Sequence, residues 1–271
     1  MYPFIHIGHF SLGTFGLCLW LAAVCACWAL HKNVQRHGIE VDAIGVVAYV
    51  TVLGVAGAKL WHVLEEPALF LQHPASLFFD RAGFAWFGGL VGGILVLYWQ
   101  GREARIGGLA MLDLASPAAA VGYGVGRLGC LVSGDGDYGT PTNLPWGMSF
   151  PHGLVPTTQR VHPTPLYELA VALMIAWFLW YRGRPRHERG AKILPVGEIT
   201  GEYLILSGIA RFLVEFIRIN PRIYWGMSNA QVASLASILA GALLLFWSRR
   251  RPQDNPEYEA APVEIEAESQ H

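Results

Sequence analysis

The sequence has few charged residues. Only 14% of its 271 residues are Asp, Glu, Lys or Arg, against about 25% in an average soluble domain. The net charge is −1, so no broad positive field is available to attract nucleic acid. By contrast, 53% of the residues are hydrophobic and ten are tryptophans, an aromatic excess typical of bilayer interfaces. The composition predicts an integral membrane protein with no nucleic-acid partner.

Cysteine is also scarce, and its spacing matches neither a disulfide framework nor a zinc motif. Cys18, Cys25 and Cys27 fall in one apolar segment, and Cys130 lies in the middle of the chain. We expect free thiols that pack as small apolar residues. No residues stand at metal-ligand spacing, so we predict neither a metal nor another cofactor.

No internal repeat of the kind found in many transporters is visible, and the apolar runs are too long for the strands of an outer-membrane barrel. Seven segments approach the length of about 20 residues that a helix needs to cross the hydrocarbon core. They are Phe10–Leu30, Ala43–Leu64, Phe84–Trp99, Leu109–Gly126, Pro165–Tyr181, Val196–Ile217 and Asn229–Trp247. The predicted fold is an all-α integral membrane protein with about seven transmembrane helices and an irregular external loop region.

The distribution of positive residues predicts the orientation in the membrane. Twelve of the 19 Lys and Arg residues fall in one set of alternating loops, five fall in the other set, and Lys59 and Arg211 lie inside spans. The positive-inside rule places the first set in the cytoplasm, so the N-terminus is outside and the C-terminus inside. We interpret residues 1–251 as one transmembrane domain and the acidic residues 252–271 as a disordered cytoplasmic tail.

The stretch from Gly122 to Gly139, GYGVGRLGCLVSGDGDYG, is predicted to begin at the outer end of the fourth helix. Its glycines permit close approach of the backbone, and with Arg127 they form a plausible phosphate site. An alternative is that the glycines only pack helices together and that Arg127 anchors the interface. Asp135 and Asp137 are candidate bases, although Gly-Asp-Gly-Asp is equally good turn chemistry.

A second group of charges lies in the sixth segment. Arg211, Glu215 and Arg218 are spaced i, i+4 and i+7, which places them on one helical face near the outer end. Intramembrane charges are costly and are usually paired and functional, so this face is either an anion site, with Glu215 orienting Arg211, or an ion-paired cluster that locks helices together. Asp113, near the inner end of the fourth segment, is interpreted as a cap.

Three motifs occur in order along the chain. The first is GRLGC at Gly126–Cys130, leading through Gly134 and Asp135 to Gly139; the second is HPTPLYE at His162–Glu168; the third is RFLVEFIR at Arg211–Arg218. Through these motifs, and through its predicted topology, nearly the whole chain resembles the prolipoprotein diacylglyceryl transferase family. Without the resemblance, Glu168 and Tyr167 would be interpreted as a helix cap and an interfacial aromatic.

The resemblance implies transfer of the diacylglyceryl group of phosphatidylglycerol to the thiol of a lipobox cysteine, with release of glycerol phosphate. The implied partners are phosphatidylglycerol, the prolipoprotein lipobox peptide and membrane lipid. The implied location is the bacterial inner membrane, with a periplasmic N-terminus and a cytoplasmic C-terminus. The transmembrane domain, residues 1–251, would then be the transferase domain, and no cofactor is expected.

The resemblance also assigns site residues. Arg127 and Arg211 are expected to hold the headgroup phosphate, and positioned arginines suit the stabilisation of a departing phosphate. Asp135, Glu215 and His162 are the candidates for handling protons or orienting the arginines, with Asp135 favoured. The expected substrate-binding residues, besides the two arginines, are Gly88, Gly89, Gly129, Gly139, His162, Tyr167 and Glu168.

Two positions depart from the family pattern. Phe87 stands where the family usually has a histidine before paired glycines, and Cys130 stands where many members have asparagine. A phenylalanine cannot take a proton, so another residue must act as base or the chemistry differs. The alternatives are a divergent paralogue that modifies another acceptor with phospholipid, and a non-enzymatic lipid or anion transporter. The second is weakened because the charges gather near the outer half of the membrane.

Overall fold

The computed structural model describes residues 2–65, 70, 86–185 and 194–250. Seven helices are present in these ranges: α1 (Thr14–Arg36), α2 (Ala43–Glu65), α5 (Trp86–Glu103), α6 (Gly108–Ser133), α7 (Thr164–Arg182), α9 (Glu198–Val214) and α10 (Asn229–Arg250). The number of helices matches the sequence prediction. The proposed tail, 252–271, lies outside the described residues.

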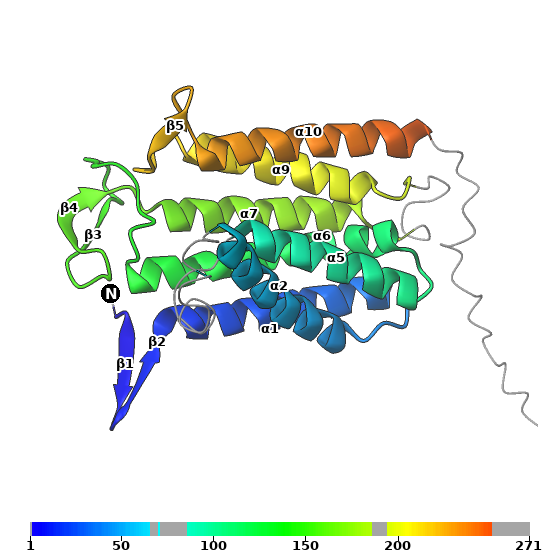
Figure 1. Ribbon diagram of the computed structural model, residues 1–271, viewed down its shortest axis with the longest axis horizontal. Coiled ribbons are helices and arrows are strands. Elements are labelled where there is room, and N and C mark those ends of the chain that lie inside the picture. The colour runs from blue at the N-terminus through cyan, green and yellow to red at the C-terminus, as the bar shows by residue number, and fades with distance from the viewer. Residues whose placement is uncertain (1, 66–69, 71–85, 186–193, 251–271) are drawn as a thin grey trace, which may run out of the picture.

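Most of the helices run side by side along the long axis of the molecule, and α2 lies obliquely to them (Figure 1). Helix α6 is central, because it packs against α1, α5, α7 and α9, while α2 packs mainly on α5 and α10 on α9. One apolar core joins α1, α2 and α6, and a second joins α6, α7 and α9. Small residues on α6, such as Ala115, Ala118 and Ala120, are buried in these cores, so the neighbouring helices approach α6 closely.

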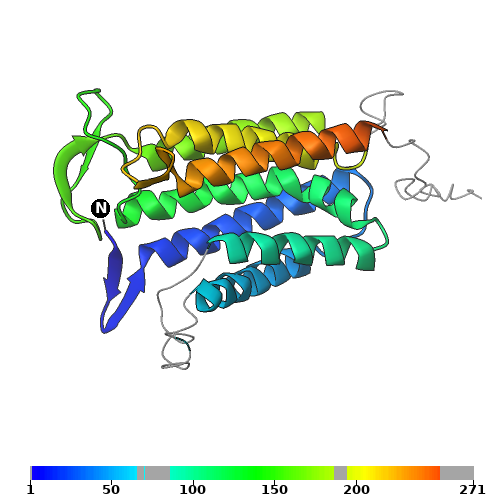
Figure 2. The same cartoon turned by 45° about the horizontal axis from the view of Figure 1, so that its top comes forward.

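Three antiparallel hairpins lie at the same end of the bundle (Figures 1 and 2). They pair β1 (Phe4–Ile7) with β2 (Phe10–Gly13), β3 (Met148–Phe150) with β4 (Thr157–Val161), and β5 (Arg222–Tyr224) with β6 (Met227–Ser228). Tyr138 stacks on Phe150 beneath the second hairpin, with ring centroids 5.1 Å apart. The described C-terminal end of α10 lies at the opposite end of the bundle, as an odd number of crossings requires.

Five of the helices are long and apolar enough to cross a membrane: α1, α2, α6, α7 and α10. Helix α9 has only 17 residues and carries charges at both ends, and α5 is rich in glycine and ends in Arg102 and Glu103, so these two are weaker spans by length or composition. With five such helices in one bundle (Figure 1), the chain is a helical multi-pass membrane protein.

Several helix ends differ from the sequence prediction. Residues 10–13 form strand β2, so α1 begins at Thr14, whose backbone N–H and hydroxyl both donate to Pro3 O. Helix α6 continues past Gly126 to Ser133, and α9 ends at Val214 instead of Ile217. Hydropathy locates the apolar part of a helix, whereas its last turns depend on caps and tertiary contacts.

Asp113 is a cap, as the sequence predicts, but it caps a different helix. Its carboxylate accepts hydrogen bonds from the backbone N–H of Gly197 (2.6 Å) and of Thr200 (2.7 Å), and from the Thr200 hydroxyl. The first N–H groups of a helix have no partner within the helix, so Asp113 on α6 satisfies the start of α9. This contact fixes α9 against α6 at the end opposite the hairpins.

Candidate active site

The longer α6 places Arg127, Gly129 and Cys130 on a helix and not in the external loop. The helix ends at Gly134, which adopts the left-handed conformation (φ +60°) and donates its N–H to Cys130 O. A Cβ at Gly134 would lie 2.7 Å from Gly153 Cα, so both the dihedral and the space require glycine. The chain then turns back, and Asp135 and Asp137 lie beside the last turns of α6.

Gly139 joins this turn to the end of α9. Its N–H donates to His162 O (2.8 Å), and the next N–H, of Thr140, donates to Ile217 O (2.7 Å). Gly139 and Arg218 form an isolated β-bridge. A Cβ on Gly139 would lie 2.5 Å from Ile217 O, so only glycine permits this approach. The predicted importance of Gly139 therefore has a structural basis, since it places Arg218 next to α6.

Helix α7 begins at the same place. Pro163 is its N-cap residue and Pro165 lies in its first turn, where proline is tolerated because the missing N–H has no helical partner. The Thr164 hydroxyl donates to Asp137 O, which ties the start of α7 to the turn after α6. Glu168 follows one turn later on the face toward α6 and α9, and its side chain is 4% exposed.

Arg127 contacts four groups. Its Nη1 lies 2.6 Å from Asp137 Oδ2 and 3.7 Å from Cys130 Sγ; Nη2 donates to Tyr123 Oη at 3.0 Å; and Nε lies 3.6 Å from Glu168 Oε2. The planar guanidinium suits such a multiple contact. Arg127 is therefore part of an interior network and not an isolated interfacial anchor.

Glu168 is the centre of this network. Its carboxylate accepts a hydrogen bond from Tyr123 Oη (2.6 Å), and it lies 3.3 Å from Arg218 Nη1 and 3.5 Å from Arg211 Nη1. With the contact to Arg127, one buried carboxylate touches all three arginines. The alternative that Glu168 is only a helix cap is wrong, because these partners come from α6 and from α9 and its continuation.

Arg211 and Glu215 pair as their i, i+4 spacing predicts, with Nη2 and Oε2 2.8 Å apart. Arg218 Nε lies 3.8 Å from the same oxygen. However, Glu215 is the C-cap of α9, so Arg218 reaches the cluster through the bend after the helix and not along a helical face. Asn220 Nδ2 donates to Glu215 Oε1 (2.6 Å).

The complete network contains three arginines and three carboxylates, so its formal charges cancel. We call it the arginine cluster; its charged members are Arg127, Arg211, Arg218, Asp137, Glu168 and Glu215. Buried polar atoms without a hydrogen-bond partner are costly. Arg211 Nη1, Glu215 Oε2 and Arg218 Nε are buried atoms of this kind in the described part of the chain, held by ion pairs alone.

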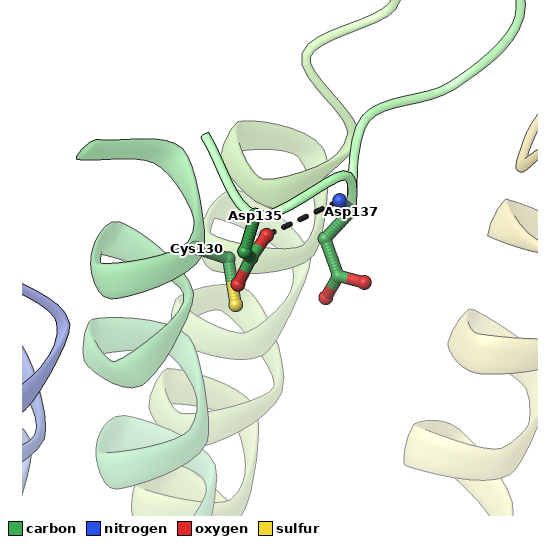
Figure 3. Close-up of side chains that lie close together, drawn as sticks. All are labelled: Cys130, Asp135 and Asp137. Atoms are coloured by element: carbon green, nitrogen blue, oxygen red, sulfur yellow. Dashed lines mark hydrogen bonds between the residues drawn. The ribbon is translucent and has the colours of Figure 1, made fainter. Parts of the chain in front are cut away.

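Asp135 and Asp137 have different environments, although both follow the end of α6 (Figure 3). Asp137 pairs with Arg218 and Arg127. Burial acts to raise its pKa, but the two guanidinium groups outweigh burial and hold the pKa below its usual range. Asp135 Oδ1 accepts the N–H of Asp137 (3.2 Å), and burial, followed by the nearby Asp137 charge, raises the pKa of Asp135.

Cys130 lies beside Asp135 (Figure 3). Ligand-type atoms of Cys130, Asp135 and Asp137 lie within 4.8 Å of one another, a grouping that the sequence prediction of no metal cluster did not anticipate. Both oxygens of Asp137 are already held by arginines, and guanidinium charges oppose a cation. We therefore assign these atoms to the surroundings of the arginine cluster.

His162 and Tyr167 form a smaller group beside the cluster. His162 Nδ1 lies 3.2 Å from Tyr167 Oη, and Trp146 Nε1 donates to the same oxygen at 2.7 Å. The His162 backbone pairs with residues 139 and 140, so this residue positions the turn that carries Asp137. The structure thus brings His162 close to the site through its backbone, while its ring contacts Tyr167.

The glycines predicted to bind substrate lie at helix crossings. Gly129 packs on Phe15 and Cys18 of α1, and Gly88 packs directly on the backbone of Gly57 in α2. Gly89 also faces α2, 3.4 Å from Gly54 O when a Cβ is built. These three glycines pack against neighbouring helices, and their proposed contact with substrate stays a prediction. The side chain of Phe87, in the first turn of α5, lies outside the described residues.

Three residues join the cluster beyond those favoured by the sequence analysis. Asp137 was considered a possible base, but Asp135 was preferred; Arg218 was noted only for its spacing; Tyr123 was not considered. Tyr123 is four residues before Arg127, and i, i+4 pairs face each other on a helix, so its position was detectable once the helix was known to continue past Gly126.

Comparison with known proteins identifies the family. The family model for prolipoprotein diacylglyceryl transferase matches residues 3–247. A phosphatidylglycerol–prolipoprotein diacylglyceryl transferase of Chromohalobacter salexigens is 31% identical over 95% of this chain and 96% of its own length. Proteins of the same name from Geobacter sulfurreducens and Bordetella avium are each 33% identical, over 92% and 93% of this chain and 95% and 96% of theirs. The chain therefore belongs to the prolipoprotein diacylglyceryl transferase family.

Proposed function

We propose that this protein transfers the diacylglyceryl group of phosphatidylglycerol to the thiol of a lipobox cysteine in a prolipoprotein. The observation that carries the proposal is the arginine cluster, which places three guanidinium groups around one buried carboxylate at the hairpin end of the bundle. The relatives that match nearly the full chain bear the name of this activity. We further propose that the hairpin end faces the periplasm across the bacterial inner membrane.

In the proposed reaction, the thiolate of the acceptor attacks the glyceryl carbon that carries the phosphate ester. A C–S bond forms, the C–O bond breaks, and glycerol phosphate leaves with the electron pair. Arg127 and Arg211 stabilise the negative charge that develops on the departing phosphate. The charge-assisted contacts of their guanidinium groups suit a phosphate with several acceptor oxygens.

We propose Asp135 as the group that accepts the thiol proton. A free cysteine has a pKa of about 8.5, so a base or a positive field must assist its ionisation. Burial raises the pKa of Asp135, which makes it a stronger base than an ordinary carboxylate. Unlike Asp137, it forms no ion pair with an arginine among the described residues. This assignment supplies a base to a chain that has Phe87 in place of a histidine.

The experiment measures diacylglyceryl transfer by the purified protein in detergent. The protein is given phosphatidylglycerol and a lipobox peptide. The expected result is a gain of one diacylglyceryl mass by the peptide and release of an equal amount of glycerol phosphate. A peptide with serine in place of the acceptor cysteine, and phosphatidylethanolamine in place of the donor, are the matched controls. Bound phospholipid without any modified peptide would instead support the divergent paralogue, which the substitution at Phe87 favours.

A further inference from the structure

The arginine cluster has no spare positive charge for a phosphate. Its three guanidinium groups are formally balanced by Asp137, Glu168 and Glu215. Asp135 adds a fourth carboxylate nearby. A phosphodiester entering this region would leave excess negative charge in a poorly hydrated site, which is strongly unfavourable. One carboxylate must therefore leave the arginines when the phosphate binds.

We propose that this carboxylate is Asp137: the donor phosphate replaces it on Arg127 and Arg218, and Asp137 returns when the product departs. The inference rests on the proposed function of the site, and it assigns Asp137 as an exchangeable counter-ion. Exchange leaves one net positive charge among the remaining members of the cluster, which matches the single negative charge of a phosphodiester.

Exposure distinguishes Asp137 from the other two carboxylates. Its side chain is 29% exposed, whereas those of Glu168 and Glu215 are 4% and 1% exposed. A displaced Asp137 carboxylate can be hydrated, and in the paired state the two arginines together hold its pKa below the usual range against the effect of burial. Displacing Glu168 would instead leave a buried charge without partners, which is costly.

The local backbone confines the exchange to the side chain. Asp137 O accepts the Thr164 hydroxyl, and Asp137 N–H donates to Asp135. With the backbone held at both groups, rotation about the short Asp side chain is sufficient to move the carboxylate between staggered rotamers. Arg127 is held by α6, and Arg218 is held by its β-bridge with Gly139. Both arginines therefore stay in place for the phosphate.

The exchange also explains how the product can leave. Glycerol phosphate is a monoester, and a phosphate monoester carries about −1.5 to −2 charge near pH 7, more than the diester donor. The single net positive charge that the cluster has without Asp137 no longer balances the charge of the product. The returning Asp137 carboxylate then competes with the product for Arg127 and Arg218, which favours release.

The test is the affinity of the full-length protein for glycerol 1-phosphate, measured by calorimetry in detergent, and KM for phosphatidylglycerol. Asp137→Asn removes the competing charge and keeps the shape. We expect affinity for glycerol 1-phosphate to rise about tenfold, because a charge-assisted hydrogen bond contributes about that factor. We also expect KM for phosphatidylglycerol to fall, and kcat to fall through slower product release. A merely structural role would weaken binding.

Asp137→Glu keeps the charge on a longer side chain and should bind glycerol 1-phosphate like the native protein. Glu202→Gln is the matched control, because Glu202 pairs with Arg182 (2.6 Å) at the other end of the bundle; it should change neither constant. If Asp137→Asn does not fold, Asp137→Ser makes the same comparison. Unchanged or weaker binding in a folded neutral variant overturns the exchange.

The outcomes separate the two proposals. Tighter glycerol 1-phosphate binding in Asp137→Asn, together with no transfer to a lipobox peptide by the native protein, would support the exchange and reject the transferase assignment. Transfer by the native protein, together with unchanged phosphate affinity in the folded variant, would support the assignment and reject the exchange.

Discussion

Arg127→Lys is the substitution that most directly tests the geometry of the arginine cluster. Three guanidinium nitrogens contact Asp137, Tyr123 and Glu168 at 2.6, 3.0 and 3.6 Å. Lysine keeps the charge, but its single ammonium group cannot contact all three of these groups at once, because they are bound by different nitrogens of the guanidinium. The variant therefore loses the directed contacts of the guanidinium and keeps its positive charge.

The size of the effect follows from the contacts that are lost. If the ammonium keeps the position nearest the phosphate, it loses the hydrogen bond to Tyr123 and the longer ion pair to Glu168. A hydrogen bond to a charged group contributes about 1.5–3 kcal/mol, and the longer pair contributes less. A total of about 3 kcal/mol corresponds to a decrease of about 100-fold in kcat/KM.

The assay is the initial rate of transfer to a lipobox peptide at several phosphatidylglycerol concentrations. Arg182→Lys is the control, since Arg182 pairs with Glu198 and Glu202 at the opposite end of the bundle. It should keep kcat/KM within about twofold of the native value, as expected for a pair remote from the reaction. Native-like transfer by a folded Arg127→Lys protein would refute the view that several directed contacts of Arg127 matter.

Three further predictions follow from the described contacts. Arg211→Ala should abolish transfer in a protein that still elutes as a folded species, because it removes one of the three arginines proposed to contact the phosphate; full activity would exclude a role for Arg211 in that site. Asp113→Ala should lower the free energy of unfolding by about 2 kcal/mol by removing the cap of α9, with transfer unchanged; an unaltered thermal transition would contradict it. Phe87→Ala should keep most of the transfer activity, because phenylalanine cannot act as the base; an inactive but folded variant would indicate a steric role.

Several residues that the sequence analysis singled out lie together in the structure. The arginines at 127 and 211 and the carboxylates at 168 and 215 were all identified, and each is in the cluster. The choice between the two aspartates was harder. Gly-Asp-Gly-Asp places both in one turn, and only the arrangement of α6 and the end of α9 shows that Asp137 meets the arginines while Asp135 meets Cys130.

Long apolar runs determined the number and order of the helices, because a span of hydrocarbon imposes a length and a composition that are visible in a single chain. The motifs likewise determined the family. Tertiary structure decided where α6 and α9 end and how Arg218 reaches Glu168. The reason is physical: a local pattern records burial and backbone preference, whereas an ion-pair network depends on distances between helices that are set only when the chain packs.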